Sequence, residues 1–260
     1  MLRSMYSGIS GLKNFQTKLD VIGNNVANVN TFGFKKGRTT FSDQISQTIA
    51  GATAPSDTRG GVNAKQVGLG ASLASIDTIG TQGSMQNTGR TLDLAISGNG
   101  YFQVRDGDTP YYTRAGNFYL DQAGTIVNSE GLKLGADDIT IPQEAQSFSI
   151  GADGKVTYVD AEGELQEAGA IELVTFANPE GLTKAGSNLF QVSSNSGEPE
   201  PKEPGVDGAG TIQSGFLEMS NVDLSEEFTE MIVAQRAFQS NTKMITTSDE
   251  ILQELVNLKR

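Results

Sequence analysis

Few residues of this chain could carry out chemistry, because it contains no cysteine, no histidine and no tryptophan. Zinc, copper and haem sites built on Cys or His are therefore excluded, as are Cys–His and Ser–His nucleophiles. The remaining candidates are acidic. Asp106-Gly107-Asp108 and Ala152-Asp153-Gly154 contain fragments of a calcium loop, and Asp137-Asp138 is an acidic pair that could hold a cation. Both glycine-containing segments lack the full set of spaced acids of an EF-hand, so we interpret them as hairpin turns.

The glycine-rich motifs predict no cofactor site either. Gly68-Leu69-Gly70 and Gly98-Asn99-Gly100 lack the third glycine of a dinucleotide-binding loop, and no phosphate-binding GxxxxGKS/T motif occurs. The formal net charge of −12 argues against a nucleic-acid partner, since phosphate binding needs a basic surface. No apolar run is long enough to span a membrane. The sequence therefore predicts no enzyme, no catalytic, cofactor-binding or metal-binding residues, and no membrane insertion.

The distribution of glycine separates the middle of the chain from its ends. Of the 31 glycines, 26 lie between residues 41 and 215, and none follows Gly215. Glycine destabilises helix interiors and suits turns, so we expect short strands in the middle and helices at both ends. Alternating apolar residues next to turn sequences in 92–104, 118–127 and 148–159 indicate hairpins. The glycine-rich and proline-rich stretches 51–70 and 195–210 are expected to be loops.

Both ends carry an apolar residue at every seventh position. These residues are Met5, Leu12, Leu19, Val26, Leu224, Met231, Phe238, Ile245 and Leu252. A sustained heptad repeat predicts a coiled-coil seam. A single stripe usually marks a helix packed on its own domain, but a narrow stripe at each end buries too little to hold either helix alone. We expect the helices to pair with each other, with other copies, or both. Ser220 or Asn221 is the expected N-cap of the last helix.

Two long motifs carry a family resemblance. Residues 23–35, Gly-Asn-Asn-Val-Ala-Asn-Val-Asn-Thr-Phe-Gly-Phe-Lys, resemble the N-terminal signature of the bacterial flagellar rod and hook proteins, and residues 220–224 and 231–238 resemble the C-terminal signature. Residues 88–102 resemble the start of the β-domain of that family. The motif residues are Asn24, Asn25, Asn28, Gly33, Phe34, Ser220, Asn221, Gln235 and Arg236.

The resemblance implies an α+β fold in which the terminal helices pair as a coiled coil and an elongated, mostly antiparallel β domain lies between them in the chain. The implied domains are residues 1–30 plus 221–260 as the inner-tube coiled coil, 31–75 as an extended linker, and 76–220 as the β-rich outer domain. The implied partners are further copies of the chain, neighbouring rod or hook-junction proteins, and the flagellar export apparatus. The implied location is the hook or basal body, after export without a cleaved signal peptide.

Within the family, two features point in different directions. The C-terminal motifs and Val67-Gly68-Leu69-Gly70 are closer to hook proteins, whereas Gln47–Lys65 and the short chain are closer to distal rod proteins. We therefore predict a subunit of the hollow flagellar hook that transmits motor torque, with a distal rod subunit as the alternative. The alternative of another class is a secreted β-rich binding module. Its aromatic platform would be Tyr101, Phe102, Tyr111, Tyr112, Phe118 and Tyr119, although core packing explains these residues better.

Overall fold

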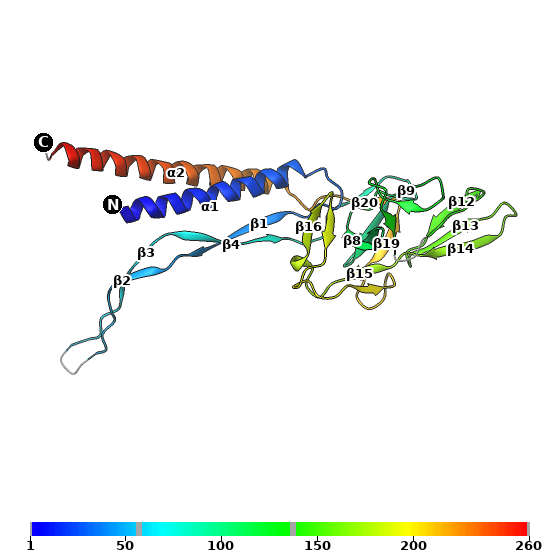
Figure 1. The fold of residues 1–260 in the computed structure, drawn as a ribbon, viewed down its shortest axis with the longest axis horizontal. Coiled ribbons are helices and arrows are strands. Elements are labelled where there is room, and N and C mark those ends of the chain that lie inside the picture. Colours follow the sequence, from blue (N-terminus) through cyan, green and yellow to red (C-terminus); the bar gives the residue numbers. More distant parts are fainter. Residues whose placement is uncertain (1, 56–58, 136–138, 259–260) are drawn as a thin grey trace. The chain divides into compact units, whose positions relative to one another are not determined.

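The computed structural model describes residues 2–55, 59–135 and 139–258, so the acidic pair Asp137-Asp138 lies outside the described residues. Two long helices, α1 (Leu2–Ala27) and α2 (Leu224–Asn257), stand at the two ends of the chain, and the strands and a short 3-10 helix, η1 (Pro179–Gly181), lie between them in sequence (Figure 1). The chain divides into two compact units, which are described separately. The first comprises residues 1–26, 37–77 and 223–260, and the second comprises 27–36 and 78–222.

The first unit combines the two helices with two strand pairs. The strands are β1 (Gly37–Asp43), β2 (Ser46–Ala50), β3 (Lys65–Gly68) and β4 (Ala71–Thr78). β1 pairs with β4, and β2 pairs antiparallel with β3. The β1–β4 pair packs on α1, since the rings of Phe15 and Phe41 lie 6.1 Å apart. The expectation of a loop over 51–70 is therefore wrong at its C-terminal end, where β3 forms a hairpin with β2.

The second unit contains the remaining strands. They are β5 (Met85–Asn87), β6 (Leu94–Ser97), β7 (Tyr101–Asp106), β8 (Thr109–Thr113), β9 (Tyr119–Leu120), β10 (Ile126–Val127), β11 (Lys133–Leu134), β12 (Ser147–Ile150), β13 (Lys155–Val159), β14 (Leu165–Ala170), β15 (Leu173–Thr175), β16 (Thr183–Gly186), β17 (Leu189–Gln191), β18 (Glu200–Lys202), β19 (Thr211–Ser214) and β20 (Phe216–Glu218). The expected helices at the ends and antiparallel strands in the middle are confirmed.

The strands of the second unit pair in four groups. The largest sheet runs in the order β16-β17-β8-β7-β11-β10-β9, and β15 bridges β7 to β18 beside this path. A three-stranded sheet, β12-β13-β14, and two strand pairs, β19–β6 and β20–β5, complete the unit. The strand pairs in these groups are antiparallel, as in the pairing of Phe102 in β7 with Thr113 in β8. The hairpins, together with β15, which pairs with both β7 and β18, therefore bring residues from distant parts of the sequence into one hydrophobic core.

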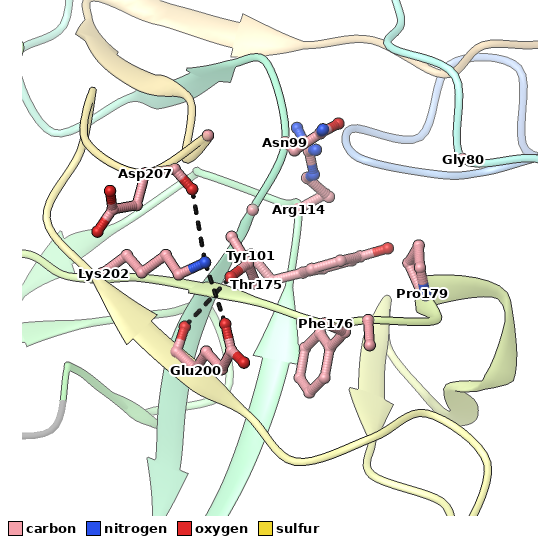
Figure 2. Close-up of a pocket in the computed structure, with 13 residues that line it drawn as sticks. Gly80, Asn99, Tyr101, Arg114, Thr175, Phe176, Pro179, Glu200, Lys202 and Asp207 are labelled. Atoms are coloured by element: carbon pink, nitrogen blue, oxygen red, sulfur yellow. Dashed lines mark hydrogen bonds and ion pairs between the residues drawn. The ribbon is translucent and has the colours of Figure 1, made fainter.

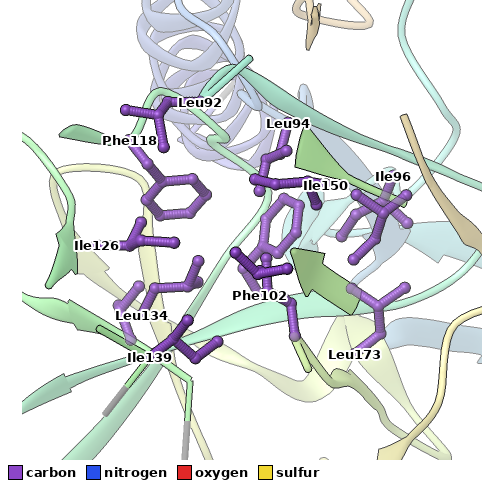
Figure 3. Packing of buried hydrophobic residues seen from close by; sticks show 14 of the residues in the cluster. Leu92, Leu94, Ile96, Phe102, Phe118, Ile126, Leu134, Ile139, Ile150 and Leu173 are labelled. Carbon is purple, nitrogen blue, oxygen red and sulfur yellow. The ribbon is translucent and has the colours of Figure 1, made fainter. Parts of the chain in front are cut away.

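A continuous apolar core fills the second unit (Figure 3). Leu94, Ile96, Phe102 and Phe118 are completely buried there, and the rings of Phe102 and Phe118 meet edge to face at 5.4 Å. A second cluster gathers Tyr101 and Tyr112 with other buried side chains. The aromatic residues considered as a binding platform are therefore mainly core residues, although Tyr119 is exposed. None of the helices in the described part of the chain is long and apolar enough to cross a membrane.

Candidate functional site

The two terminal helices contact each other in the first unit and run antiparallel. The ammonium of Lys18 pairs with the Glu230 carboxylate, and the Asn25 amide donates to Glu227 Oε2 at 3.2 Å. The other end of the interface brings Gly8 against Ile245. As the residue number increases along α1, the number of the contacted residue decreases along α2. The two helices therefore form one antiparallel pair (Figure 1).

Two glycines let the helices approach closely. A Cβ atom added to Gly8 would lie 3.3 Å from Cγ1 of Ile245, and one added to Gly11 would lie 3.1 Å from the amide of Asn241. Contacts of this length are tight, so a larger residue at either position would push the partner side chain aside. These two glycines therefore allow α2 to pack closely against the N-terminal half of α1.

The predicted seam residues lie at positions of intermediate burial. Met5, Leu12, Leu19, Val26, Met231, Phe238, Ile245 and Leu252 are half-buried, whereas Leu224 is exposed. The most buried residues of α2 are instead Glu227, Ala234 and Ser248, each three positions after a residue of the heptad repeat. The role of the heptad residues as a seam stays a prediction, because their half-burial alone does not show which positions meet the partner helix. The most buried positions of α2 hold polar or small residues, which give no apolar signal in the sequence.

Asn25 fixes one end of the helix pair to β1. Its Nδ2 donates to the Gly37 carbonyl at 2.9 Å, and its Oδ1 accepts from the Gly37 amide at 2.9 Å. The same Nδ2 also reaches the Glu227 carboxylate, and both side chains are buried. One amide thus joins α1, the start of β1 and the first turns of α2. This explains why an asparagine, a poor residue for a helix interior, stands there.

A buried ion cluster lies in the second unit and joins three distant segments. Glu218 Oε1 accepts from Lys35 Nζ at 2.6 Å, and its Oε2 accepts from Arg114 Nη1 at 3.3 Å. The Lys35 and Arg114 side chains are 2% and 5% exposed, and the Glu218 side chain is fully buried. Burial lowers the pKa of Lys35, against the opposing effect of the Glu218 carboxylate. No motif predicted this cluster, because its three members are far apart in the sequence.

Asn221 and Gly33 fasten the chain on either side of this cluster. Asn221 Oδ1 accepts from the Lys36 amide at 2.8 Å, and its Nδ2 donates to the Ile79 carbonyl at 2.9 Å. Gly33 adopts a φ of +69°, and a Cβ there would lie 2.5 Å from the backbone nitrogen of Ala115. A side chain at Gly33 would therefore meet both backbone strain and a steric clash.

The other motif residues are placed differently. Asn28 Oδ1 accepts from the Thr31 hydroxyl at 3.1 Å, and the Lys184 ammonium lies 5.3 Å from the ring centre of Phe34. Asn24, Gln235 and Arg236 are exposed. Their exposure leaves these three side chains accessible to other molecules.

The N-cap of α2 is Asp223, so the expected cap at Ser220 or Asn221 is wrong. The Asp223 carboxylate accepts from the amides of Ser225 and Glu226. Asn221 is engaged by the backbone of residues 79–81, and Ser220 is buried with its Oγ accepting from the Val222 amide. The side chains of Ser220 and Asn221 already form other hydrogen bonds before the helix begins, and Asp223 caps it instead.

The described residues contain no group of three acidic side chains that could hold a metal ion. The acids of 106–108 and 153 lie instead at turns, where the Asp153 carboxylate accepts from the Lys155 amide at 3.3 Å. The candidate functional site is the helix pair together with the exposed apolar residues of α2.

Comparisons with known proteins agree with this geometry. Residues 5–35 match the family "Flagella basal body rod protein", residues 95–158 match "Flagellar hook protein FlgE/F/G D1 domain", and residues 213–258 match "Flagellar basal body rod FlgEFG protein C-terminal". The chain is 65% identical to the flagellar basal-body rod protein FlgG of Bacillus subtilis (strain 168), over the full length of both chains.

Two relatives from a second organism are also similar over the full length of both chains. One is the rod protein FlgG of Borreliella burgdorferi, at 42% identity, and the other is the hook protein FlgE of the same organism, at 31%. The fold and these matches define a structural subunit of the axis of the bacterial flagellum, not an enzyme. The chain belongs to the flagellar basal-body rod and hook family, FlgE/F/G, as the resemblance of both terminal motifs predicted.

Proposed function

We propose that this chain is a distal rod subunit of the flagellar basal body, which polymerises through its terminal helices into a hollow segment that transmits torque. The identity of 65% with a rod protein of matching length carries this proposal. The similarity to the hook protein is lower, and its alignment extends over 441 positions because that relative is much longer than 260 residues. The sequence motifs alone favoured the hook, but the identity with the rod protein favours the rod.

The apolar residues left exposed on α2 support polymerisation. Phe228, Ile232 and Val233 are 49%, 57% and 54% exposed, and Leu255 and Val256 are also exposed near the C-terminal end. Apolar patches of this kind mark contact surfaces. A contact that joins different surfaces of two copies without closing a ring generates a helical filament. Neighbouring copies, and other rod or hook-junction proteins at the ends of the segment, are the partners we infer.

The β2–β3 hairpin is the second surface that needs a partner. Its strands are exposed along their whole length, and Ile45, Ile49, Val62 and Val67 expose apolar side chains. An isolated two-stranded hairpin is marginally stable in water. We infer that neighbouring copies cover it in the rod, and that the stretch Gln47–Lys65 contributes to the contact. Passage through the flagellar export apparatus remains an expectation from the resemblance.

Immunogold labelling of isolated hook–basal bodies tests the location. An antibody against the full chain should label the straight segment below the hook, and the same particles treated with pre-immune antibody give the background. Label along the curved hook, with none below it, would overturn the rod proposal in favour of the hook.

A pair of substitutions on one helix tests the seam. Met231→Asp places a charge at a half-buried seam position, whereas Ser240→Asp places the same charge at an exposed one. Burying an unpaired charge is costly, so Met231→Asp should abolish rod assembly and swimming, while Ser240→Asp should leave both close to wild type. Swimming and isolated basal bodies are measured in complemented deletion strains. Normal rods with Met231→Asp would show that the seam is not needed for rod assembly.

A further inference from the structure

A pocket of about 460 Å³ lies in the second unit next to the ion cluster (Figure 2). Its lining includes the side chains of Asn99, Tyr101, Arg114, Phe176 and Lys202. The rings of Tyr101 and Phe176 meet edge to face with their centres 5.8 Å apart, which forms an apolar wall. The pocket therefore combines an aromatic surface with two cationic side chains, and the helix pair takes no part in it.

The ion cluster behind this pocket contains more positive than negative charge. Lys35 and Arg114 both contact the one carboxylate of Glu218, and all three side chains are almost fully buried. An arginine stays charged in proteins, and buried charges are normally paired. Among the described residues, no second carboxylate contacts either cation. An additional anion near Arg114 would balance the cluster.

Arg114 also has an unused hydrogen-bond donor. Its Nη2 donates to the Gly98 carbonyl at 2.8 Å and its Nη1 to Glu218, but its buried Nε has no acceptor among the described residues. Buried polar groups are usually hydrogen-bonded, and an unpaired one carries a free-energy cost. An acceptor that entered the pocket on the Arg114 side would let the guanidinium shift slightly and pair more fully.

Lys202 supplies the second cation of the pocket and limits the charge of a ligand. Its Nζ contacts the Glu200 carboxylate at 3.0 Å and the Asp207 carbonyl at 3.5 Å. Glu200 and Asp207 line the same pocket and are exposed. These two acids disfavour a multiply charged anion such as phosphate. A group with a single negative charge meets less repulsion.

We propose that this pocket binds one carboxylate group, held by the Arg114 guanidinium and the Lys202 ammonium, with its aliphatic stem against the rings of Tyr101 and Phe176. The carboxylate belongs either to an acidic side chain of another copy of this chain or to a small free carboxylic acid. The chain offers suitable acidic side chains, because Glu162 and Glu164 are exposed at the turn between β13 and β14.

The test compares an acid with its neutral isostere. The protein labelled with nitrogen-15 is titrated with butyrate, which carries one carboxylate on an aliphatic stem, and, separately, with the neutral butyramide, while the Nε–H resonance of Arg114 is followed by NMR. We expect a saturable shift with the acid alone. Lys202→Met should weaken this binding about tenfold, since it removes a charged hydrogen-bond donor. Lys155→Met is the matched control, because Lys155 is exposed in a loose 3.8 Å pair with Glu167 outside the pocket.

Three outcomes would overturn the proposal: equal shifts with the acid and the amide, no shift with either, or equal weakening by both lysine substitutions. The source of the carboxylate follows from a dilution series without added ligand. If the Arg114 resonance moves with protein concentration, and Glu162→Gln together with Glu164→Gln stops that movement, another copy provides the group. A resonance that responds only to added butyrate identifies a small free acid, and the pocket is confirmed in either case.

Discussion

The β core and the helix pair of this chain are built in opposite ways. In the core, Phe102, Leu94 and Ile96 are completely buried and pack against one another. In the helix pair, the most buried residues of α2 include Glu227 and Ser248, and large apolar residues such as Ile232 are exposed. The β domain buries its apolar side chains in its own core, whereas the helix pair leaves many of its apolar side chains exposed to solvent.

This difference shows which part of the subunit depends on its neighbours. Hydrophobic burial is the main stabilising term in folding, so the β domain is expected to be stable in the free subunit. The helices gain less from each other, and the buried side-chain amide of Asn14 has an unpaired nitrogen among the described residues. We infer that the helix pair reaches full stability only when other copies cover it. The following predictions test the contrast, from the largest effect to the smallest.

Matched Phe→Ala substitutions give the most direct test. Phe102→Ala removes a completely buried ring and should lower the free energy of unfolding by about 3–5 kcal/mol. Phe238→Ala removes a half-buried ring from α2 and should cost less than about half of that in the free subunit. Denaturant unfolding followed by circular dichroism measures both. Equal losses would show that the helix pair is as well packed as the core.

Glu218→Gln tests whether the ion cluster belongs to the stable part. The substitution keeps the shape of the side chain but leaves the Lys35 and Arg114 charges without their carboxylate, so the free energy of unfolding should fall by about 3 kcal/mol. Glu167→Gln, in the exposed pair with Lys155, is the control and should cost less than about 0.5 kcal/mol. Thermal unfolding of both variants provides the comparison. A loss no larger than that of the control would contradict a structural role for the cluster.

Asn25→Leu should have the smallest effect and should act on the helix pair alone. It removes the hydrogen bonds to Gly37 and Glu227, which should cost about 1–2 kcal/mol. Hydrogen exchange should accelerate at the amides of α2 but not in the β core. Gln16→Leu, at an exposed position of α1, is the control. Acceleration throughout the protein would mean that the two regions unfold together.

Local patterns predicted most of the fold. The heptad repeats and the absence of glycine after Gly215 indicated both helices, and alternation next to turns indicated β7, β10 and β13. Residues 31–75 were predicted to be a linker, but the structure divides them between two units and forms strands in them. The strands β2 and β3 are exposed throughout, so they carry no alternation of apolar and polar residues that could identify them.

The contacts that organise the site were less predictable. The four asparagines near the end of α1 were recognised as unusual, yet nothing in the sequence showed that Asn25 meets both Gly37 and Glu227. The buried face of α2 was missed because it consists of polar and small residues. The ion cluster was missed because pairing across distant segments leaves no spacing to recognise. Sequence periodicity describes elements, whereas these contacts depend on how the elements meet.

The distance in sequence between Lys35 and Glu218 has a consequence for synthesis. These partners are 183 positions apart, and Glu227, the α2 partner of Asn25, follows even later. At about 5–20 residues per second, the first 35 residues leave the ribosome roughly 10–40 seconds before their buried partners exist. Most of the stability of a helix in a protein comes from its tertiary packing, and α1 has no α2 to pack against during this time. The N-terminal segment therefore spends the period of chain elongation without its native contacts, and during that time any factor that recognises this segment has access to it.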